Sequence, residues 1–166
     1  QMSYNVCLPN YSIGADCYKE IPYFARYYGK KAVVIGGKTA MSKAKDALLE
    51  GIAGSDLEIL DFIWYGGDST YENGNALIAN ETVQQADIIF GIGGGRACDT
   101  CKYVANEMDK PLFTFPTVGS NCASVTAICV IYNPDGSFRE YYYPKVAEHT
   151  FINSAIIADS PYELLW

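Results

Sequence analysis

Short apolar runs alternate with longer stretches of helical periodicity over the first two thirds of the chain. The runs, such as Lys-Ala-Val-Val-Ile at residues 31–35, hold few polar residues, which is typical of strands buried on both faces. In the stretches between them, apolar residues recur every three or four positions, as on one side of a helix. In chain order, the predicted strands and helices alternate as residues 31–35, 39–52, 57–65, 75–85, 87–92, 97–108 and 111–116. This order predicts a parallel sheet covered by helices on both faces, with right-handed crossovers.

The pattern changes after residue 116. Residues 126–132 and 138–143 predict two strands, because the sequence Asn-Pro-Asp-Gly at 133–136 is typical of a turn between antiparallel strands. Residues 155–159 predict a last short strand. The predicted fold class is therefore α/β: a Rossmann-like parallel sheet with helices on both faces plus an antiparallel β-hairpin.

A further helix is predicted to begin near the end of the sequence. Ser160 is suited to the N-cap, Pro161 to the first helical position and Glu163 to a capping box. The sequence stops at Trp166, soon after this start signal. We therefore expect the natural protein to continue, and we interpret residues 1–166 as one N-terminal domain.

Composition narrows the class of protein. Of the 166 residues, 49% are hydrophobic and 19% charged, which is typical of a globular domain. The formal net charge of −7 argues against nucleic acid as a partner, because such binding needs a basic face. No apolar run approaches the ~20 residues that span a bilayer, and no signal peptide is visible, so we expect no membrane partner. Six cysteines are too sparse for a disulfide framework, which favours a reducing, cytoplasmic location.

Three glycine clusters follow the predicted strands, at Gly36–Gly37, Gly66–Gly67 and Gly93–Gly95. In an open parallel sheet, ligands bind beyond the carboxyl ends of the strands. The third cluster joins a buried strand directly to a helix, whose first N–H groups are suited to an anion such as a pyrophosphate. The structural alternative is a tight turn in which helix and strand pack closely. Neither standard phosphate motif fits, because the third glycine of the dinucleotide fingerprint falls on Arg96 and the first glycine of a phosphate loop falls on Ala32.

Two further motifs favour ordinary packing over chemistry. Cys98 and Cys101 form a C-x-x-C pair just inside the third predicted helix, and no second pair exists to complete a zinc site. We interpret them as small helix residues that pack on the sheet, as buried free cysteines commonly do. His149, the single histidine, is interpreted as a surface residue rather than a base or a ligand. We therefore predict neither a catalytic residue nor a metal ligand within the chain.

Two stretches resemble a known family. Residues 91–102 contain the pattern Gly-Gly-Gly-x-x-x-Asp-x-x-Lys, and residues 115–123 contain Pro-Thr-x-x-Ser-x-Cys-Ala. Paired in this order and spacing, they resemble the motifs of the glycerol dehydrogenases, in the iron-containing alcohol dehydrogenase and dehydroquinate synthase superfamily. The turn at Gly66–Asp68 and residues 130–138 continue the resemblance, which covers nearly the whole chain from about Gly14.

The resemblance implies a dinucleotide-binding domain of an enzyme that oxidises a secondary alcohol of a polyol with NAD or NADP. It implies that the pyrophosphate lies on the turn at Gly93–Gly95, with neighbouring side chains along the cofactor. The implied cofactor-binding positions are Gly94, Gly95, Arg96, Asp99, Thr117, Ser120, Thr126, Ile128 and Tyr132. Cys122 stands where the family motif has an aspartate that contacts the polyol, which leaves the substrate open.

The choice between NAD and NADP depends on the residues after the first predicted strand. Proteins that prefer NAD usually carry an acidic residue there, which accepts the ribose 2′-OH. Gly37 occupies this place and Lys38 stands beside it. A missing carboxylate with an added cation favours a 2′-phosphate, so Gly37 and Lys38 are further candidate cofactor-binding residues and NADP stays open beside NAD.

The resemblance also implies a metal ion that this chain does not bind by itself. In the family, zinc or iron is held by an aspartate and two histidines of a following helical domain, which would lie beyond Trp166. We therefore expect no dehydrogenase activity from residues 1–166 alone, and a homo-oligomer for the full-length protein. Two alternatives stay open. One is an enzyme like the glycerol-1-phosphate dehydrogenases, and the other is a noncatalytic flavodoxin-like binding module, which the Pro-Thr motif and the hairpin argue against.

Overall fold

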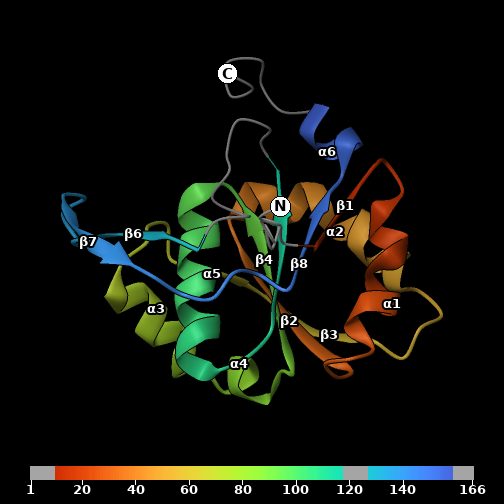
Figure 1. The fold of residues 1–166 in the computed structure, drawn as a ribbon, viewed down its shortest axis with the longest axis horizontal. Coiled ribbons are helices and arrows are strands. Elements are labelled where there is room, and N and C mark those ends of the chain that lie inside the picture. Colours follow the sequence, from red (N-terminus) through yellow and green to blue (C-terminus); the bar gives the residue numbers. More distant parts are fainter. Residues whose placement is uncertain (1–9, 118–126, 159–166) are drawn as a thin grey trace, which may run out of the picture.

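A computed structural model describes residues 10–117 and 127–158. In these ranges six strands form a parallel sheet in the order β1-β8-β5-β4-β2-β3, and β6 pairs with β7 in a separate antiparallel sheet (Figure 1). The strands are β1 (Asn10–Ile13), β2 (Lys31–Gly36), β3 (Glu58–Trp64), β4 (Ile88–Gly93), β5 (Leu112–Pro116), β6 (Cys129–Tyr132), β7 (Phe138–Tyr142) and β8 (His149–Ile152). The predicted fold class, with its parallel sheet and its hairpin, is confirmed.

Helices cover both faces of the parallel sheet (Figure 1). They are the 3-10 helix η1 (Cys17–Glu20), α1 (Ile21–Ala25), α2 (Lys38–Ile52), α3 (Tyr71–Ile78), α4 (Glu81–Gln85), α5 (Gly95–Met108) and α6 (Ser154–Ala158). Side chains of η1, α1 and α2 belong to one buried cluster, and side chains of α3, α4 and α5 belong to another. No helix in the described ranges is both long and apolar enough to cross a membrane.

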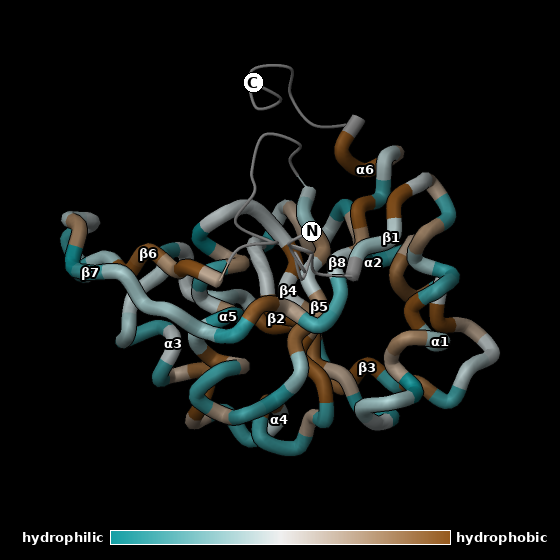
Figure 2. The backbone as a smooth tube through the Cα atoms, viewed as in Figure 1, coloured by the Kyte–Doolittle hydropathy of each residue, from teal (hydrophilic) through white to brown (hydrophobic). Residues whose placement is uncertain are grey.

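Strand β2 explains why the central strands are apolar throughout. Ala32 and Val34 pack in the cluster under α2, whereas Val33 and Ile35 pack in the cluster under α5. Successive side chains of a strand point to opposite faces, so a strand covered on both faces needs apolar residues at every position. Figure 2 shows this as hydrophobic colour along the central strands, with hydrophilic colour mainly in the outer turns.

The predicted helix at residues 75–85 is in fact two helices. The helix α3 begins earlier, at Tyr71, where the Thr70 side chain accepts the N–H of Asn73. The Asn80 side chain then accepts the N–H of Val83 and starts α4. An asparagine that caps a new helix competes with continuation of the preceding one, which the apolar spacing alone did not reveal.

The end of the described chain also differs from the prediction. The predicted strand at residues 155–159 is wrong: the strand is β8, and α6 follows it. The Asn153 side chain accepts the N–H groups of Ala155 and Ile156, which caps α6 and ends the extended backbone. Strand β1 at the sheet edge and the helices η1 and α1 were not predicted. The helix expected from Ser160 lies outside the described residues.

Candidate functional site

The two central strands send their helices to opposite faces of the sheet. Strands β2 and β4 are neighbours, and α2 leaves β2 toward one face whereas α5 leaves β4 toward the other. The chain order reverses here, since β3 lies on one side of β2 and β4 on the other. Open α/β sheets bind their ligands in the crevice at such a switch point, beyond the carboxyl ends of the strands.

Glycine allows the turns after β2 and β4 to approach one another at this crevice. A Cβ on Gly36 would overlap the carbonyl oxygen of Ile92. Gly93 has a φ of +143°, which side chains rarely adopt, and a Cβ on it would lie 3.0 Å from the Ala97 Cβ. The backbone N–H of Gly37 donates to the Ile92 carbonyl at 3.3 Å. The turns after β2 and β4 therefore pack closely against one another, as the structural alternative expected. This packing places the starts of α2 and α5 side by side.

Both helix starts leave their backbone N–H groups without a side-chain cap. Gly37 and Gly94 are the N-cap residues of α2 and α5, and neither first turn contains an acidic residue. In contrast, Thr70 and Asn80 cap α3 and α4 through their side chains. Uncapped N–H groups and the helix dipole together favour an anion. The two helix starts therefore have the chemistry that suits an anion, and an anion site here stays a prediction.

Arg96 connects the turn after β3 to the hairpin. Its guanidinium lies 3.2 Å from the Asp68 carboxylate and 4.7 Å from the centre of the Tyr132 ring. The backbone N–H of Tyr132 donates to the Ser69 carbonyl at 2.8 Å. The exposed Arg96 thus stands at the start of α5 with its side chain fixed from two sides.

Lys38 and Trp64 lie beside the same crevice, on its β3 side. The Lys38 ammonium lies 4.2 Å from the centre of the Trp64 ring, a cation–π contact between the first residue of α2 and the last residue of β3. Sequence reasoning identified Lys38 but missed Trp64. The available signal was its position, two residues before the glycines at Gly66–Gly67.

Asp99 lies below the helix start rather than in the open crevice. Its carboxylate pairs with the Lys102 ammonium at 3.4 Å and accepts the N–H of Val130 at 3.0 Å. Burial raises the pKa of the Asp99 carboxyl, while the Val130 N–H and Lys102 act in the opposite direction. The carboxylate therefore holds the hairpin on α5, and its predicted contact with a cofactor stays a prediction.

The remaining predicted positions are only partly described. Thr117 is buried directly after β5, whose last residue, Pro116, lies beside Gly93 in the sheet register. Ile128 is 42% exposed just before β6. Ser120, Cys122 and Thr126 lie outside the described residues. The crevice therefore brings together these predicted positions: Gly37, Lys38, Gly94, Gly95, Arg96 and Tyr132.

The cysteine pair packs in the core, as predicted. Cys98 and Cys101 are fully buried, and their thiols donate to the carbonyls of Gly93 and Ile35 at 3.7 and 3.6 Å. Burial raises the pKa of Cys98 to about 12, so this thiol stays protonated. No group of three or more histidine, cysteine, aspartate or glutamate residues in the described ranges could hold a metal ion.

The interpretation of His149 as a surface residue is wrong. It begins β8 and is 3% exposed, with its ring stacked on Phe24 at a centroid distance of 3.9 Å. Its Nε2 lies 2.8 Å from the Ser12 Oγ on β1. Burial lowers the pKa of His149 below its ordinary value of 6.5. The hydrophilic neighbours Glu148 and Thr150 suggested exposure, but pairing of β8 between β1 and β5 buries the ring.

Comparison with known proteins gives the same picture of the fold. Residues 9–159 match the family model described as iron-containing alcohol dehydrogenase. The chain is 30% identical over 156 residues to the glycerol dehydrogenase of Citrobacter freundii, covering 93% of this chain and 42% of that protein. It is 27% identical over 139 residues to the glycerol-1-phosphate dehydrogenase [NAD(P)+] of Methanoregula boonei, covering 82% of this chain and 36% of that protein.

A solved structure agrees with these matches. The crystal structure of glycerol dehydrogenase from Schizosaccharomyces pombe superposes with a TM-score of 0.84 at 23% identity. The superposition covers 99% of this chain and 42% of that chain. The sequence thus spans about two fifths of the length of the proteins it matches.

Proposed function

The chain belongs to the iron-containing alcohol dehydrogenase family, and from this premise we propose that it is the dinucleotide-binding part of an NAD(P)-linked polyol dehydrogenase. One observation carries the proposal: α2 and α5 begin side by side at the switch point without side-chain caps. A dinucleotide has a doubly charged diphosphate that suits these N–H groups. The glycine turns leave no Cβ between the backbone and such a ligand.

The residues of the crevice fit the parts of a dinucleotide. The N–H groups of Gly94, Gly95 and Arg96 would hold the diphosphate, because they are the first groups of the uncapped helix α5. Asp68 holds the Arg96 side chain aside, over the Tyr132 ring, so the backbone of the turn stays accessible. When bound, the nicotinamide supplies hydride transfer with the alcohol carbon. The protein's own contribution is binding and orientation.

NADP fits the described residues better than NAD. No acidic residue stands directly after β2, where Gly37 is the N-cap residue of α2 and provides no side chain. The Lys38 ammonium, over Trp64, supplies a cation next to a flat ring, which suits a 2′-phosphate next to an adenine. The first turn of α2 contains no carboxylate that would repel this phosphate.

Substrate, metal and assembly belong to the whole protein. We propose that residues 1–166 form its N-terminal domain, because they correspond to about two fifths of the matched relatives. Zinc or iron would be held by residues outside the described ranges, because residues 10–117 and 127–158 contain no group of three or more histidine, cysteine, aspartate or glutamate residues that could hold it. A small polyol as substrate, a homo-oligomeric assembly and a cytoplasmic location complete the proposal. No catalytic step is assigned to this chain.

A phosphorylated polyol is the second candidate substrate. The match to the glycerol-1-phosphate dehydrogenase of Methanoregula boonei, 27% identical over 139 residues, supports it. Cys122, in the place of the family's polyol-contacting aspartate, gives glycerol itself no special support. Assay of the whole protein with glycerol and with glycerol 1-phosphate separates the two substrates. Family membership favours either enzyme over a noncatalytic flavodoxin-like module.

Direct titration tests the cofactor-binding proposal. The protein is titrated with NADPH and with NADH in a calorimeter, and the fluorescence of Trp64 is followed in parallel with Trp166 replaced by phenylalanine. We expect saturable binding of both nucleotides, with NADPH tighter and with quenching of Trp64. Absence of heat and of quenching at millimolar nucleotide would overturn the proposal. No alcohol oxidation is expected from this chain alone.

A further inference from the structure

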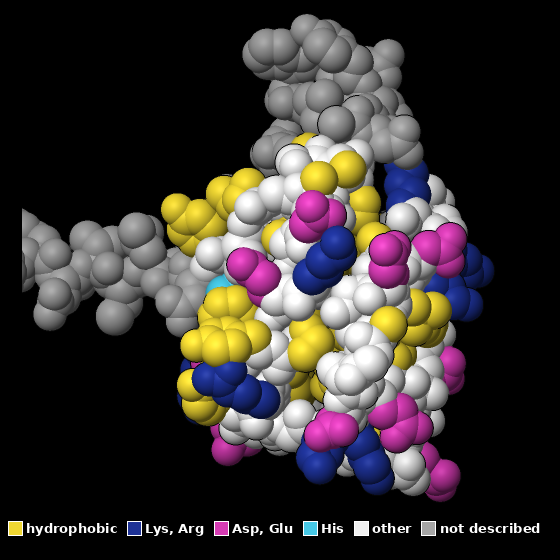
Figure 3. Space-filling model, turned by 90° about the vertical axis from the view of Figure 1, so that its right-hand side faces the viewer, with side chains coloured by type: hydrophobic (Ala, Val, Ile, Leu, Met, Phe, Trp, Pro, Cys, Tyr) yellow, Lys and Arg dark blue, Asp and Glu magenta, His cyan; other side chains and the backbone are white. Residues whose placement is uncertain are grey.

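A second pocket lies at the other end of the sheet, away from the glycine turns. It has a volume of about 320 Å³ and opens between α1, the residues that follow α1, and the amino ends of β5 and β8. Its walls include the rings of Tyr23, Tyr28 and Phe113, with Glu148 and His149 between them. Figure 3 looks onto the side of α1, where hydrophobic side chains gather at the surface. We call this the α1 pocket.

His149, a residue of the α1 pocket wall, has one ring nitrogen without a partner in the described ranges. His149 is 3% exposed, and its Nδ1 has no hydrogen-bond partner among the described residues. Its other ring nitrogen, Nε2, is accounted for by the Ser12 Oγ at 2.8 Å. Buried polar atoms are nearly always hydrogen-bonded, so an unpaired ring nitrogen favours the neutral ring that carries its proton on Nε2.

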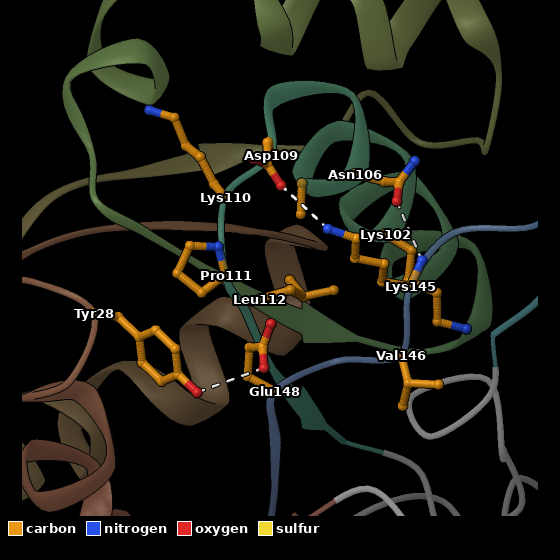
Figure 4. Close-up of a pocket in the computed structure, with 11 residues that line it drawn as sticks. Tyr28, Lys102, Asn106, Asp109, Lys110, Pro111, Leu112, Lys145, Val146 and Glu148 are labelled. Atoms are coloured by element: carbon orange, nitrogen blue, oxygen red, sulfur yellow. Dashed lines mark hydrogen bonds and ion pairs between the residues drawn. The ribbon is translucent and has the colours of Figure 1, made fainter.

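The charges around the pocket favour a cation. Glu148 accepts one long hydrogen bond, at 3.5 Å from the Tyr28 hydroxyl, which Figure 4 shows directed at the carboxylate. Glu148 takes part in no ion pair among residues 10–117 and 127–158. Lys145, in the adjoining cavity of about 160 Å³ drawn in Figure 4, pairs with Asp109 instead. The carboxylate thus has lone pairs available to a ligand.

The guanidinium of Arg26 is engaged with two tyrosines of the pocket wall. Arg26 lies 3.7 Å from the centre of the Tyr23 ring and 4.6 Å from that of Tyr27, and it donates to the Tyr27 hydroxyl at 2.7 Å. These contacts hold the tyrosines that border the pocket, and Glu148 has no counterion in the part of the chain that the structure describes. Aromatic walls beside an uncompensated carboxylate are the chemistry that recognises organic cations.

We propose that the α1 pocket binds an organic cation that carries one aromatic ring. The ring would lie among the tyrosine and phenylalanine rings, and its cationic N–H groups would donate to the Glu148 carboxylate. In the tautomer with the proton on Nε2, His149 donates to the Ser12 Oγ and stays neutral, so the pocket wall sets no positive charge against such a ligand. The volume, at the lower end for small-molecule sites, suits a single ring.

Benzamidine is the probe, because it combines one ring with a planar cation that has paired donors. Benzamide has the same shape without the charge, and cyclohexanecarboxamidine has the charge without the aromatic ring. We expect benzamidine to bind saturably in calorimetry, at least roughly tenfold more tightly than either analogue. No detectable binding at several millimolar, or equal binding of benzamidine and benzamide, would overturn the proposal.

A matched pair of variants locates the site. Glu148→Gln removes the charge and keeps the shape, and we expect it to weaken benzamidine binding by roughly five- to tenfold. Glu58→Gln on β3, at the far edge of the sheet, should leave binding unchanged. Equal losses in both variants, or none in either, would contradict the site. If Glu148→Gln does not fold, chemical-shift changes of Phe113 on benzamidine binding to the unaltered protein decide the location. NADPH binding should be unchanged throughout, so the outcome is independent of the cofactor site.

Discussion

The Lys102 ammonium lies 3.4 Å from the Asp99 carboxylate, with their side chains 0% and 9% exposed. Asp99 also accepts the N–H of Val130, and Lys102 donates to the carbonyl of Ile128 at 3.1 Å. One buried ion pair therefore fastens the backbone before and within β6 to α5, about one turn after the start of that helix. The hairpin carries Tyr132, against which Arg96 packs. The ion pair thus positions part of the candidate site without lying in the open crevice.

Breaking this ion pair should destabilise the fold strongly. Lys102→Met leaves the Asp99 carboxylate buried without its counterion, and we expect a loss of about 3 kcal/mol or more in the free energy of unfolding. Lys145→Met is the control, because it breaks an ion pair whose side chains are 79% and 90% exposed. Such pairs contribute at most about 1 kcal/mol. Urea unfolding measures both losses, and similar small values would show that the buried pair does not hold the hairpin.

A side-chain cap on α5 should stabilise the protein and weaken its binding of NADPH. Gly94 has extended backbone angles, φ −86° and ψ −163°, which a capping aspartate can adopt. Gly94→Asp should stabilise the protein by about 0.5 kcal/mol and weaken NADPH binding by roughly tenfold to a hundredfold, because its carboxylate would accept the N–H groups that would otherwise bind the diphosphate. Thermal unfolding and calorimetry measure the two effects.

The control for Gly94→Asp is Gly94→Asn, which places a side chain of the same size at the start of α5 without the negative charge. It should keep the part of the stabilisation that comes from the side-chain hydrogen bond and lose less affinity than Gly94→Asp. If the two variants bind NADPH equally well, charge at the start of α5 does not govern nucleotide binding, and the anion site must lie elsewhere.

Lys38 should discriminate between the two nucleotides. Lys38→Ala removes the cation above Trp64, and we expect it to weaken NADPH binding by about tenfold while changing NADH binding less than about twofold. Lys45→Ala is a matched control on the same helix, since the Lys45 ammonium lies 5.2 Å from the centre of the Phe62 ring. Parallel calorimetric titrations check this, and equal losses for both nucleotides would contradict a contact with the 2′-phosphate.

Acid should destabilise the protein through His149. Burial lowers the pKa of this side chain in the folded state, so the unfolded chain, with an ordinary pKa of 6.5, binds a proton more readily. The stability contributed by the neutral ring is therefore complete above pH 6.5 and is lost as the pH falls through 6.5 toward the lower, folded-state pKa. The slope can reach about 1.4 kcal/mol per pH unit for one proton.

The measurement is urea unfolding between pH 7.5 and 5 for the unaltered protein and for His149→Gln. The variant retains a polar group that can reach the Ser12 hydroxyl but cannot titrate, so its pH dependence should be shallower by the contribution of this one group. Identical slopes in the two proteins would show that His149 does not titrate differently on folding.

The sequence predicted the parts of the candidate site that the backbone forms. Glycines after apolar runs at Gly36–Gly37 and Gly93–Gly95 identified both turns, and the motif positions pointed to Arg96. The partners of the site were not visible. Trp64 beside Lys38 and Asp68 beside Arg96 come together only because β3 lies next to β2, which no spacing along the chain encodes.

By itself the sequence determined the alternation of strands and helices, the two-sided burial of the central strands and the hairpin turn. These depend on local rules, namely the period of apolar residues and the conformational range of glycine, proline and asparagine. Only the tertiary structure decided that the side chains of His149 and Asp99 are buried, because the burial of a polar side chain depends on which distant strand covers it. Ser12 lies 137 residues from His149 along the chain, and Asp99 lies 31 from Val130, yet each pair shares a hydrogen bond. Long-range pairing of β1 with β8 and docking of β6 on α5 supplied these contacts.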